Sequence, residues 1–175
     1  LEYWWRAVTN RASSVIQGLD PAPYVYYIKY PEKVTGREVA HYYLLELRAF
    51  KQYLERVNGQ VITEDMLSNA VEVYNEHYRL MEQLDELRKQ DPPLVSGYEH
   101  WEAEMAGLSM PKEEHNRLMR SYLEEIVKRQ DKPKSSVRLY LSGAAMDKGG
   151  AELYRLIEES GGQVVCEDIS VDSSH

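Results

Sequence analysis

The chain has 175 residues, of which 43% are hydrophobic and 29% are charged, and its formal net charge is -8 at pH 7. This charge argues against nucleic acid as the main partner, because phosphate binding needs clustered lysine and arginine side chains. The sequence also lacks the run of about 20 apolar residues that a membrane-spanning helix needs. We therefore expect one ordinary globular domain, or one and a half small ones, with neither nucleic acid nor a membrane as partner.

The single cysteine, Cys166, excludes a disulfide within the chain and fits a reducing compartment, so we expect a cytoplasmic protein. The N-terminus has neither the charged start nor the apolar stretch of a signal peptide. It also has no initiator methionine, which suggests a fragment of a longer protein.

Two elements are expected near the N-terminus. Residues 1–17 can form a helix, which Gly18 and two following prolines would end. Residues 24–30 are rich in β-forming side chains and stop at Pro31, so they predict a short strand.

Two long amphipathic helices follow. The first begins after a possible capping box at residues 35–38 and carries apolar residues three and four positions apart up to the turn at residues 58–59. The second begins after Thr63, which can cap it. The short connection predicts an antiparallel helical hairpin with a shared apolar core. The residues expected in that core are Phe50, Leu54, Tyr74 and Tyr78.

Two shorter helices complete the predicted helical segment, which covers residues 1–130. One is expected over residues 98–105, after the break at residues 91–93. The other is expected to start at Pro111, because a proline fits the first position of a helix.

The pattern changes in the last part of the chain, where residues 131–175 predict the start of a Rossmann-like half-domain. Residues 137–141 and 163–166 are strand signals, and the helix between them would end at Gly161. A parallel pair of strands needs neighbouring strands to bury both faces, so the half-domain would be truncated. The predicted fold class is α/β: a helical hairpin and further helices lead into a partial Rossmann-like parallel βαβ unit.

Two features have potential chemistry. Ser142, Gly143 and Ala144 form a predicted turn between strand and helix, where open α/β sheets bind ligands, although tight packing also explains small residues there. Cys166 is either an iron–sulfur ligand or a small buried apolar residue, since one thiol cannot build a cluster that takes about three or four. The histidines lack zinc-binding spacing, and no residue is assigned a catalytic role.

The order of several short motifs resembles the 2-hydroxyacyl-CoA dehydratase / benzoyl-CoA reductase superfamily. The resemblance covers roughly residues 24–170. The motifs that carry it are the helix core ELRAFKQYLE at 46–55, the stretch from Gly59 to Glu76, the strand LYLSG at 139–143 and the segment LIEESGGQVV at 156–165.

The resemblance implies a subunit that pairs with a homologous second subunit or forms a homodimer. Each subunit of such enzymes holds a four-iron four-sulfur cluster through three cysteines. The enzyme removes water from an (R)-2-hydroxyacyl-CoA through a ketyl radical, after a separate ATP-dependent iron–sulfur activator protein supplies an electron. Two of the cluster cysteines belong to an N-terminal domain that this chain lacks, so we expect the chain to be inactive alone.

By position in the resemblance, Ser170 stands where the third cluster cysteine is expected. A serine hydroxyl is a poor iron ligand beside a thiolate. Either Cys166 substitutes from four residues earlier, or the subunit has lost the cluster. We favour the loss, because four residues along a strand displace a sulfur by about 13 Å.

Two other functional classes stay open. The chain could come from a cluster-free homologue that serves as a scaffold or partner-binding subunit. It could also be an unrelated helical interaction module, in which case the two predicted strands would not pair in parallel.

Overall fold

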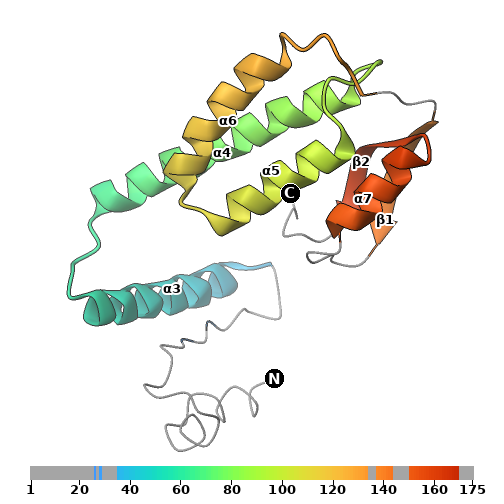
Figure 1. Cartoon of the computed structure of the whole chain (residues 1–175). Helices are drawn as coiled ribbons and strands as arrows, with labels where there is room; N and C mark the ends of the chain where they lie inside the picture. Colours follow the sequence, from blue (N-terminus) through green and yellow to red (C-terminus); the bar gives the residue numbers. More distant parts are fainter. Residues whose placement is uncertain (1–25, 27, 29–34, 134–136, 144–149, 170–175) are drawn as a thin grey trace, which may run out of the picture. The chain divides into compact units, whose positions relative to one another are not determined.

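The computed structural model describes residues 26, 28, 35–133, 137–143 and 150–169. The chain divides into two compact units, residues 1–64 and 65–175. The predicted helix at 1–17 lies outside the described residues. Of the predicted strand at 24–30 only Tyr26 and Ile28 are described, and both lie outside helices and strands. The described elements are α3 (Arg37–Asn58), α4 (Glu64–Lys89), α5 (Gly97–Ser109), α6 (Lys112–Ile126), β1 (Val137–Gly143), α7 (Gly150–Glu159) and β2 (Gly162–Ile169) (Figure 1).

The first unit contains α3. The expected capping box at residues 35–38 is wrong, because Gly36 takes the N-cap position with a φ of 122° and no side chain caps the helix. The predicted end of the helix is confirmed: Gly59 has a left-handed φ of 69°, and its N–H donates to the Glu55 carbonyl oxygen. Glycine adopts this conformation without a steric penalty. No residue of α3 is buried.

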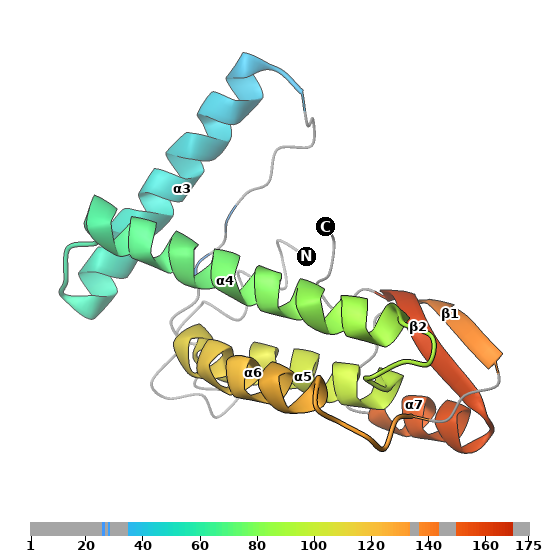
Figure 2. The same cartoon turned by 90° about the horizontal axis from the view of Figure 1, so that it is seen from above.

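In the second unit, α4, α5 and α6 lie side by side (Figures 1 and 2). An apolar core forms where α4 and α6 meet, and Val95 from the connection before α5 completes it. A buried aliphatic side chain contributes about 1.5–3 kcal/mol relative to an exposed one, so this cluster is a main stabiliser of the layer. Its buried residues are Leu80, Leu84, Val95, Met119, Leu123 and Ile126.

The expected burial of Tyr74 and Tyr78 is wrong. Their exposed fractions are 47% and 50%, whereas Leu84, further along the same stripe, is fully buried. The Asn116 side-chain amide of α6 donates to the Val73 carbonyl oxygen, so the start of α6 lies beside the middle of α4. The 15 residues of α6 cannot cover the 26 residues of α4, which leaves part of the stripe exposed.

A capping box starts α5 at Gly97, one residue earlier than expected, and the helix continues to Ser109. The Ser96 hydroxyl accepts from the Glu99 N–H, and the Glu99 carboxylate accepts from the Ser96 N–H. Arg129, which follows α6, donates to both carboxylate oxygens of Glu99. This bidentate pair ties the end of α6 to the start of α5.

β1 and β2 pair in parallel with α7 between them in sequence, which confirms the predicted βαβ unit. Leu139 pairs with Val164 but Tyr140 pairs with Cys166, so Val165 is the extra residue of a bulge in β2. Both strands are longer than expected. Ser142 and Gly143 are therefore the last residues of β1 and not a turn, and Cys166 lies inside β2 and not at its end.

A second core joins the helical layer to the βαβ unit. The Trp101 ring of α5 stacks on the Tyr154 ring of α7, with centroids 5.5 Å apart, and Val164 of β2 completes the cluster. All three side chains are at most 2% exposed. Among the described residues, no helix combines the length and the apolar character that crossing a membrane requires.

This second core predicts that Gly97→Ala destabilises the protein. A Cβ at Gly97 would lie 2.9 Å from Tyr154 Cδ1 and 3.0 Å from Val164 Cβ, and neither ring nor strand can yield freely. Overpacking of this kind costs about 1–3 kcal/mol in the free energy of unfolding, measurable by urea denaturation. Gly143→Ala is the matched control, because a Cβ there meets nothing within 4 Å. A Gly97→Ala protein as stable as the control would contradict this packing.

Candidate functional site

A cavity of about 500 Å³ opens in the second unit, with walls from α4, α5, the α5–α6 connection and β2. One end is lined by carboxylate, guanidinium and imidazole side chains from α4, α5 and β2. The other end is lined by histidine, lysine and tyrosine side chains around the start of α6. The two ends differ in charge and burial.

The buried end is organised around Arg88 of α4, whose side chain is 3% exposed. Its Nη1 lies 3.0 Å from Glu167 Oε1 on β2, and its Nη2 lies 2.7 Å from Asp85 Oδ1 on α4. The Tyr154 hydroxyl of α7 donates to the second oxygen of Glu167. A buried charge must be paired to be tolerated, so these contacts fix β2 and α7 against α4.

His100 of α5 enters the same cluster and is 5% exposed. Its Nε2 lies 3.2 Å from Asp85 Oδ1, and its Nδ1 lies 3.3 Å from Glu167 Oε1. Burial would lower the pKa of His100, but the two carboxylates outweigh it and raise the pKa.

The carboxylates of the cluster titrate differently. For Asp85, burial would raise the pKa, but His100 and Arg88 outweigh this and lower it to about 2. For Glu167, burial is again outweighed, by His100, Arg88 and Tyr154, and the pKa is lowered to about 2. The pKa of Glu104 is instead raised, chiefly by burial. Asp85 and Glu167 are thus anionic near neutral pH.

At the other end of the cavity, three side chains form a chain of hydrogen bonds. The Nδ1 atoms of His77 and His115 lie 3.2 Å apart, and His115 Nε2 lies 2.9 Å from the Ala103 carbonyl oxygen. Lys112 Nζ lies 3.3 Å from His77 Nε2 and donates to the Gly107 carbonyl oxygen at 2.6 Å. The same ammonium lies 5.6 Å from the centre of the Tyr74 ring.

The groups at the two ends of this chain of hydrogen bonds determine which imidazole nitrogen atoms carry a proton. A carbonyl only accepts, so His115 carries its proton on Nε2 and its Nδ1 accepts. His77 must then donate from Nδ1, which leaves its Nε2 to accept from Lys112. Burial, followed by the charge of Lys112, lowers the pKa of His77 to about 4, and burial also lowers the pKa of His115. Both imidazoles are therefore neutral, and they hold Lys112 at the cavity wall.

The structure does not bring together the site residues that the sequence predicts. Cys166 lines the cavity beside Glu167. Ser142 and Gly143 are exposed at the end of β1 and do not line it. Ala144 and Ser170 lie outside the described residues.

Sequence reasoning missed the ionisable residues of the cavity. His100 and Glu104 are four apart on one helix, and Asp85 and Arg88 are three apart on another, so each pair lies on one helix face. These local pairs do not reveal Glu167, which is 79 positions from its partner Arg88.

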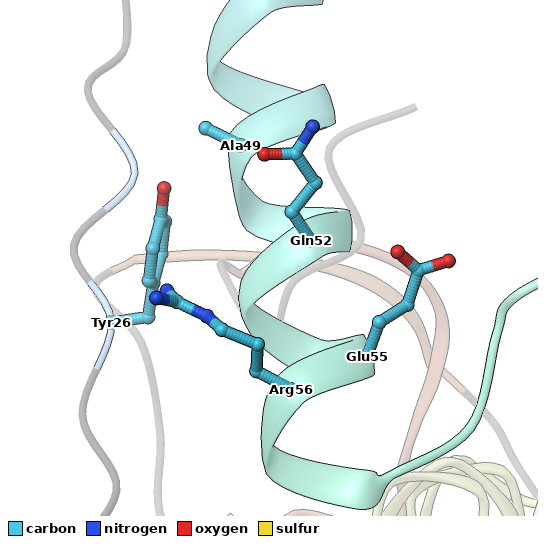
Figure 3. A pocket seen from close by; sticks show the side chains of 5 residues that line it. All are labelled: Tyr26, Ala49, Gln52, Glu55 and Arg56. Atoms are coloured by element: carbon cyan, nitrogen blue, oxygen red, sulfur yellow. The ribbon is translucent and has the colours of Figure 1, made fainter.

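A second hollow, of about 560 Å³, lies beside α3 in the first unit (Figure 3). In this view the Arg56 side chain extends toward Tyr26, whereas Gln52 and Glu55 project to the other side of the helix. The Glu55 carboxylate accepts from the Ile62 N–H at 2.9 Å and pairs with Lys51 at 3.3 Å, so its charge is already compensated. Because none of the side chains that line it is a buried ionisable group, this hollow is the weaker candidate.

The cavity of the second unit does not fit an iron–sulfur cluster by itself. Such clusters take about three or four thiolate ligands, and Cys166 is the only cysteine of the chain. The other donors that line the cavity are imidazole, carboxylate and amine groups, which are harder ligands than a thiolate. The residues present offer at most one thiolate ligand to a cluster.

Residues 9–174 match the model of a protein family described as 2-hydroxyglutaryl-CoA dehydratase, D-component. The chain is 30% identical to one of the benzoyl-CoA reductase subunits of Thauera aromatica over 164 residues, which cover 94% of this chain and 42% of that protein. It is 27% identical to the (R)-phenyllactyl-CoA dehydratase beta subunit of Clostridium sporogenes over 122 residues, which cover 70% of this chain and 32% of that protein. The chain thus spans less than half the length of these two curated relatives.

The hydrogen-bond chain predicts the tautomers of its two histidines. Nitrogen-15 NMR of the imidazole rings at pH 7 should show His77 protonated at Nδ1 and His115 at Nε2. On acidification His77 should stay neutral until about pH 4, whereas an unfolded chain takes up this proton near pH 6.5. The stability that His77 contributes is therefore complete above pH 6.5 and is lost as the pH falls toward 4. A doubly protonated His77 in the folded protein at pH 6 would contradict the assignment.

Proposed function

Because the chain belongs to the 2-hydroxyglutaryl-CoA dehydratase D-component family, we propose that it is a segment of one subunit of an enzyme that removes water from an (R)-2-hydroxyacyl-CoA. The observation that carries this proposal is the match of residues 9–174 to the 2-hydroxyglutaryl-CoA dehydratase D-component family, and the similarity to a phenyllactyl-CoA dehydratase subunit agrees with it. The matched regions cover less than half of each relative, which supports a longer parent subunit. We propose that the segment is inactive alone.

The parent subunit works with partners. Both relatives are named as subunits, so the family supports pairing with a second subunit, which we propose is a homologue or a second copy of the parent. The βαβ unit exposes Val137 (52%), Tyr140 (61%) and Leu156 (61%), which supports further protein packed on it. A separate ATP-dependent iron–sulfur activator supplies the electron that starts the reaction, and the assembly works in the cytoplasm.

The contribution of this segment is structural and substrate-binding. The Arg88–Glu167 pair fixes β2, and with it Cys166, against the helical layer. Ser142 and Gly143 are exposed at the carboxyl end of a parallel strand, which is where α/β sheets bind ligands. We propose that this edge, with Ala144, contacts the acyl-CoA.

One observation favours a second candidate, a cluster-free subunit that serves as a scaffold. Ser170 stands where the family resemblance expects a cluster cysteine, and Cys166 is the only thiol. In this alternative the parent binds its partner subunit but holds no cluster of its own.

We predict that the segment alone neither turns over a 2-hydroxyacyl-CoA nor assembles a cluster. The assay supplies the activator, ATP and a reductant, and product formation should equal that of the blank. Anaerobic reconstitution with iron and sulfide should leave far less than one cluster per chain, because a stable cluster takes about three or four thiolates. Turnover above the blank, or one full cluster per chain, would overturn the proposal.

The parent subunit separates the two candidates. If Cys166 ligates a cluster, Cys166→Ala should abolish the parent's cluster absorbance, whereas the control Ser170→Ala should leave it unchanged. If the parent is a cluster-free scaffold, the unmutated parent already lacks this absorbance. A cluster that survives Cys166→Ala would contradict both candidates and place the ligands outside this segment.

A further inference from the structure

Three possible metal-binding groups converge in the buried end of the cavity. One ligand atom from each of His100, Glu104 and Glu167 lies within 4.8 Å of the other two. His100 and Glu104 are four residues apart on α5, so their side chains lie on the same helix face. Glu167 approaches from β2 and completes the group.

Two of these groups have unused binding capacity. The His100 side chain is 6% exposed, yet its Nδ1 makes no hydrogen bond; the 3.3 Å approach to Glu167 Oε1 is a contact without hydrogen-bond geometry. The Glu104 carboxylate has no hydrogen bond or ion pair within the described part of the chain. A buried polar atom without a partner is destabilising, so such an arrangement needs an explanation.

The charges around the group leave a deficit of positive charge. Asp85, Glu104 and Glu167 supply three carboxylates, and Arg88 supplies one guanidinium. The two lysines that line the cavity are engaged elsewhere: Lys89 pairs with Glu86, and Lys112 donates to the Gly107 carbonyl oxygen. A histidine that binds a metal ion gives up its second proton, and with His100 in that neutral form one divalent cation would bring the ionised cluster to zero net charge.

The surroundings of His100 also suit a metal ligand. Its Nε2 lies 3.2 Å from Asp85 Oδ1, so a proton on Nε2 is directed to a carboxylate. This leaves the Nδ1 lone pair on the side of Glu167. A carboxylate behind a histidine fixes the ring and its tautomer in many metal sites.

We propose that His100, Glu104 and Glu167 form a binding site for a divalent transition-metal ion, with Zn²⁺ as the best match. Imidazole nitrogen and carboxylate oxygen are both established zinc ligands at about 2.0–2.2 Å. Binding draws the three donors closer together, and Glu104 can move because no hydrogen bond holds it. Three protein ligands leave one position of a tetrahedral zinc ion open toward the cavity. The three proposed ligands do not include Cys166, the one thiol of the chain.

The test is a calorimetric titration of the full chain with Zn²⁺ after treatment with a chelator. We expect saturable binding of one equivalent and a higher midpoint of thermal unfolding with zinc present, because a ligand of the folded state stabilises it. Absence of saturable binding would overturn the proposal.

Two variants test whether Glu104 binds the metal ion. Glu104→Gln keeps the side-chain volume and removes no hydrogen bond, so it should fold normally and lower zinc affinity by at least about tenfold, since even outer-shell changes cost about 10–100-fold. Glu102→Gln, an exposed position on the same helix, is the matched control and should bind like the unmodified chain. Equal affinity in the two variants would overturn the proposal.

Cobalt(II) supplies a readout that does not depend on any variant. Bound by one imidazole and two carboxylates, it should give weak visible bands without the intense near-ultraviolet absorption of a cobalt–thiolate bond. That absorption, together with loss of zinc binding in Cys166→Ser, would place the metal on the cysteine and contradict the assignment.

Discussion

The arrangement of the second unit depends on the buried guanidinium of Arg88. Its side chain is 3% exposed, and an isolated charge at such a position would cost several kcal/mol. The charge is compensated by Asp85 from its own helix and by Glu167 from β2, and Glu167 also accepts from Tyr154 of α7. Helix α4, helix α7 and strand β2 thus meet at one carboxylate. The helical layer and the βαβ unit cannot separate without leaving a charge unpaired.

The same ion pairs give the cavity its chemical character. They keep carboxylate, imidazole and guanidinium groups at one end, while the neutral His77 and His115 hold an ammonium group at the other. The two relatives are named as subunits of a reductase and of a dehydratase, and the chain is similar to both. A segment shared by proteins with different named reactions fits a role in architecture and binding.

The sequence predicts local features of this protein better than distant contacts. The parallel βαβ unit, the glycine that ends α3 and the start of α6 after Pro111 followed from apolar periodicity and turn residues. Ser96 and Glu99 have the spacing of a capping box, but the weak apolar pattern of α5 does not by itself predict a helix start there. The exposure of Tyr74 and the partners of Arg88 could not be predicted, since they depend on where α6 and β2 pack. Charged side chains reveal their partners only in three dimensions.

A double-mutant cycle on Arg88 and Glu167 tests most directly whether this ion pair holds the two parts of the unit together. Arg88→Met and Glu167→Gln are made singly and together, and the free energy of unfolding is measured by urea denaturation. Each single change should cost at most about 3–5 kcal/mol, because it removes one buried counter-charge from a partner that keeps another, Asp85 for Arg88 and His100 for Glu167. The double change should cost clearly less than the sum of the two. Additive effects, within about 0.5 kcal/mol, would contradict the account.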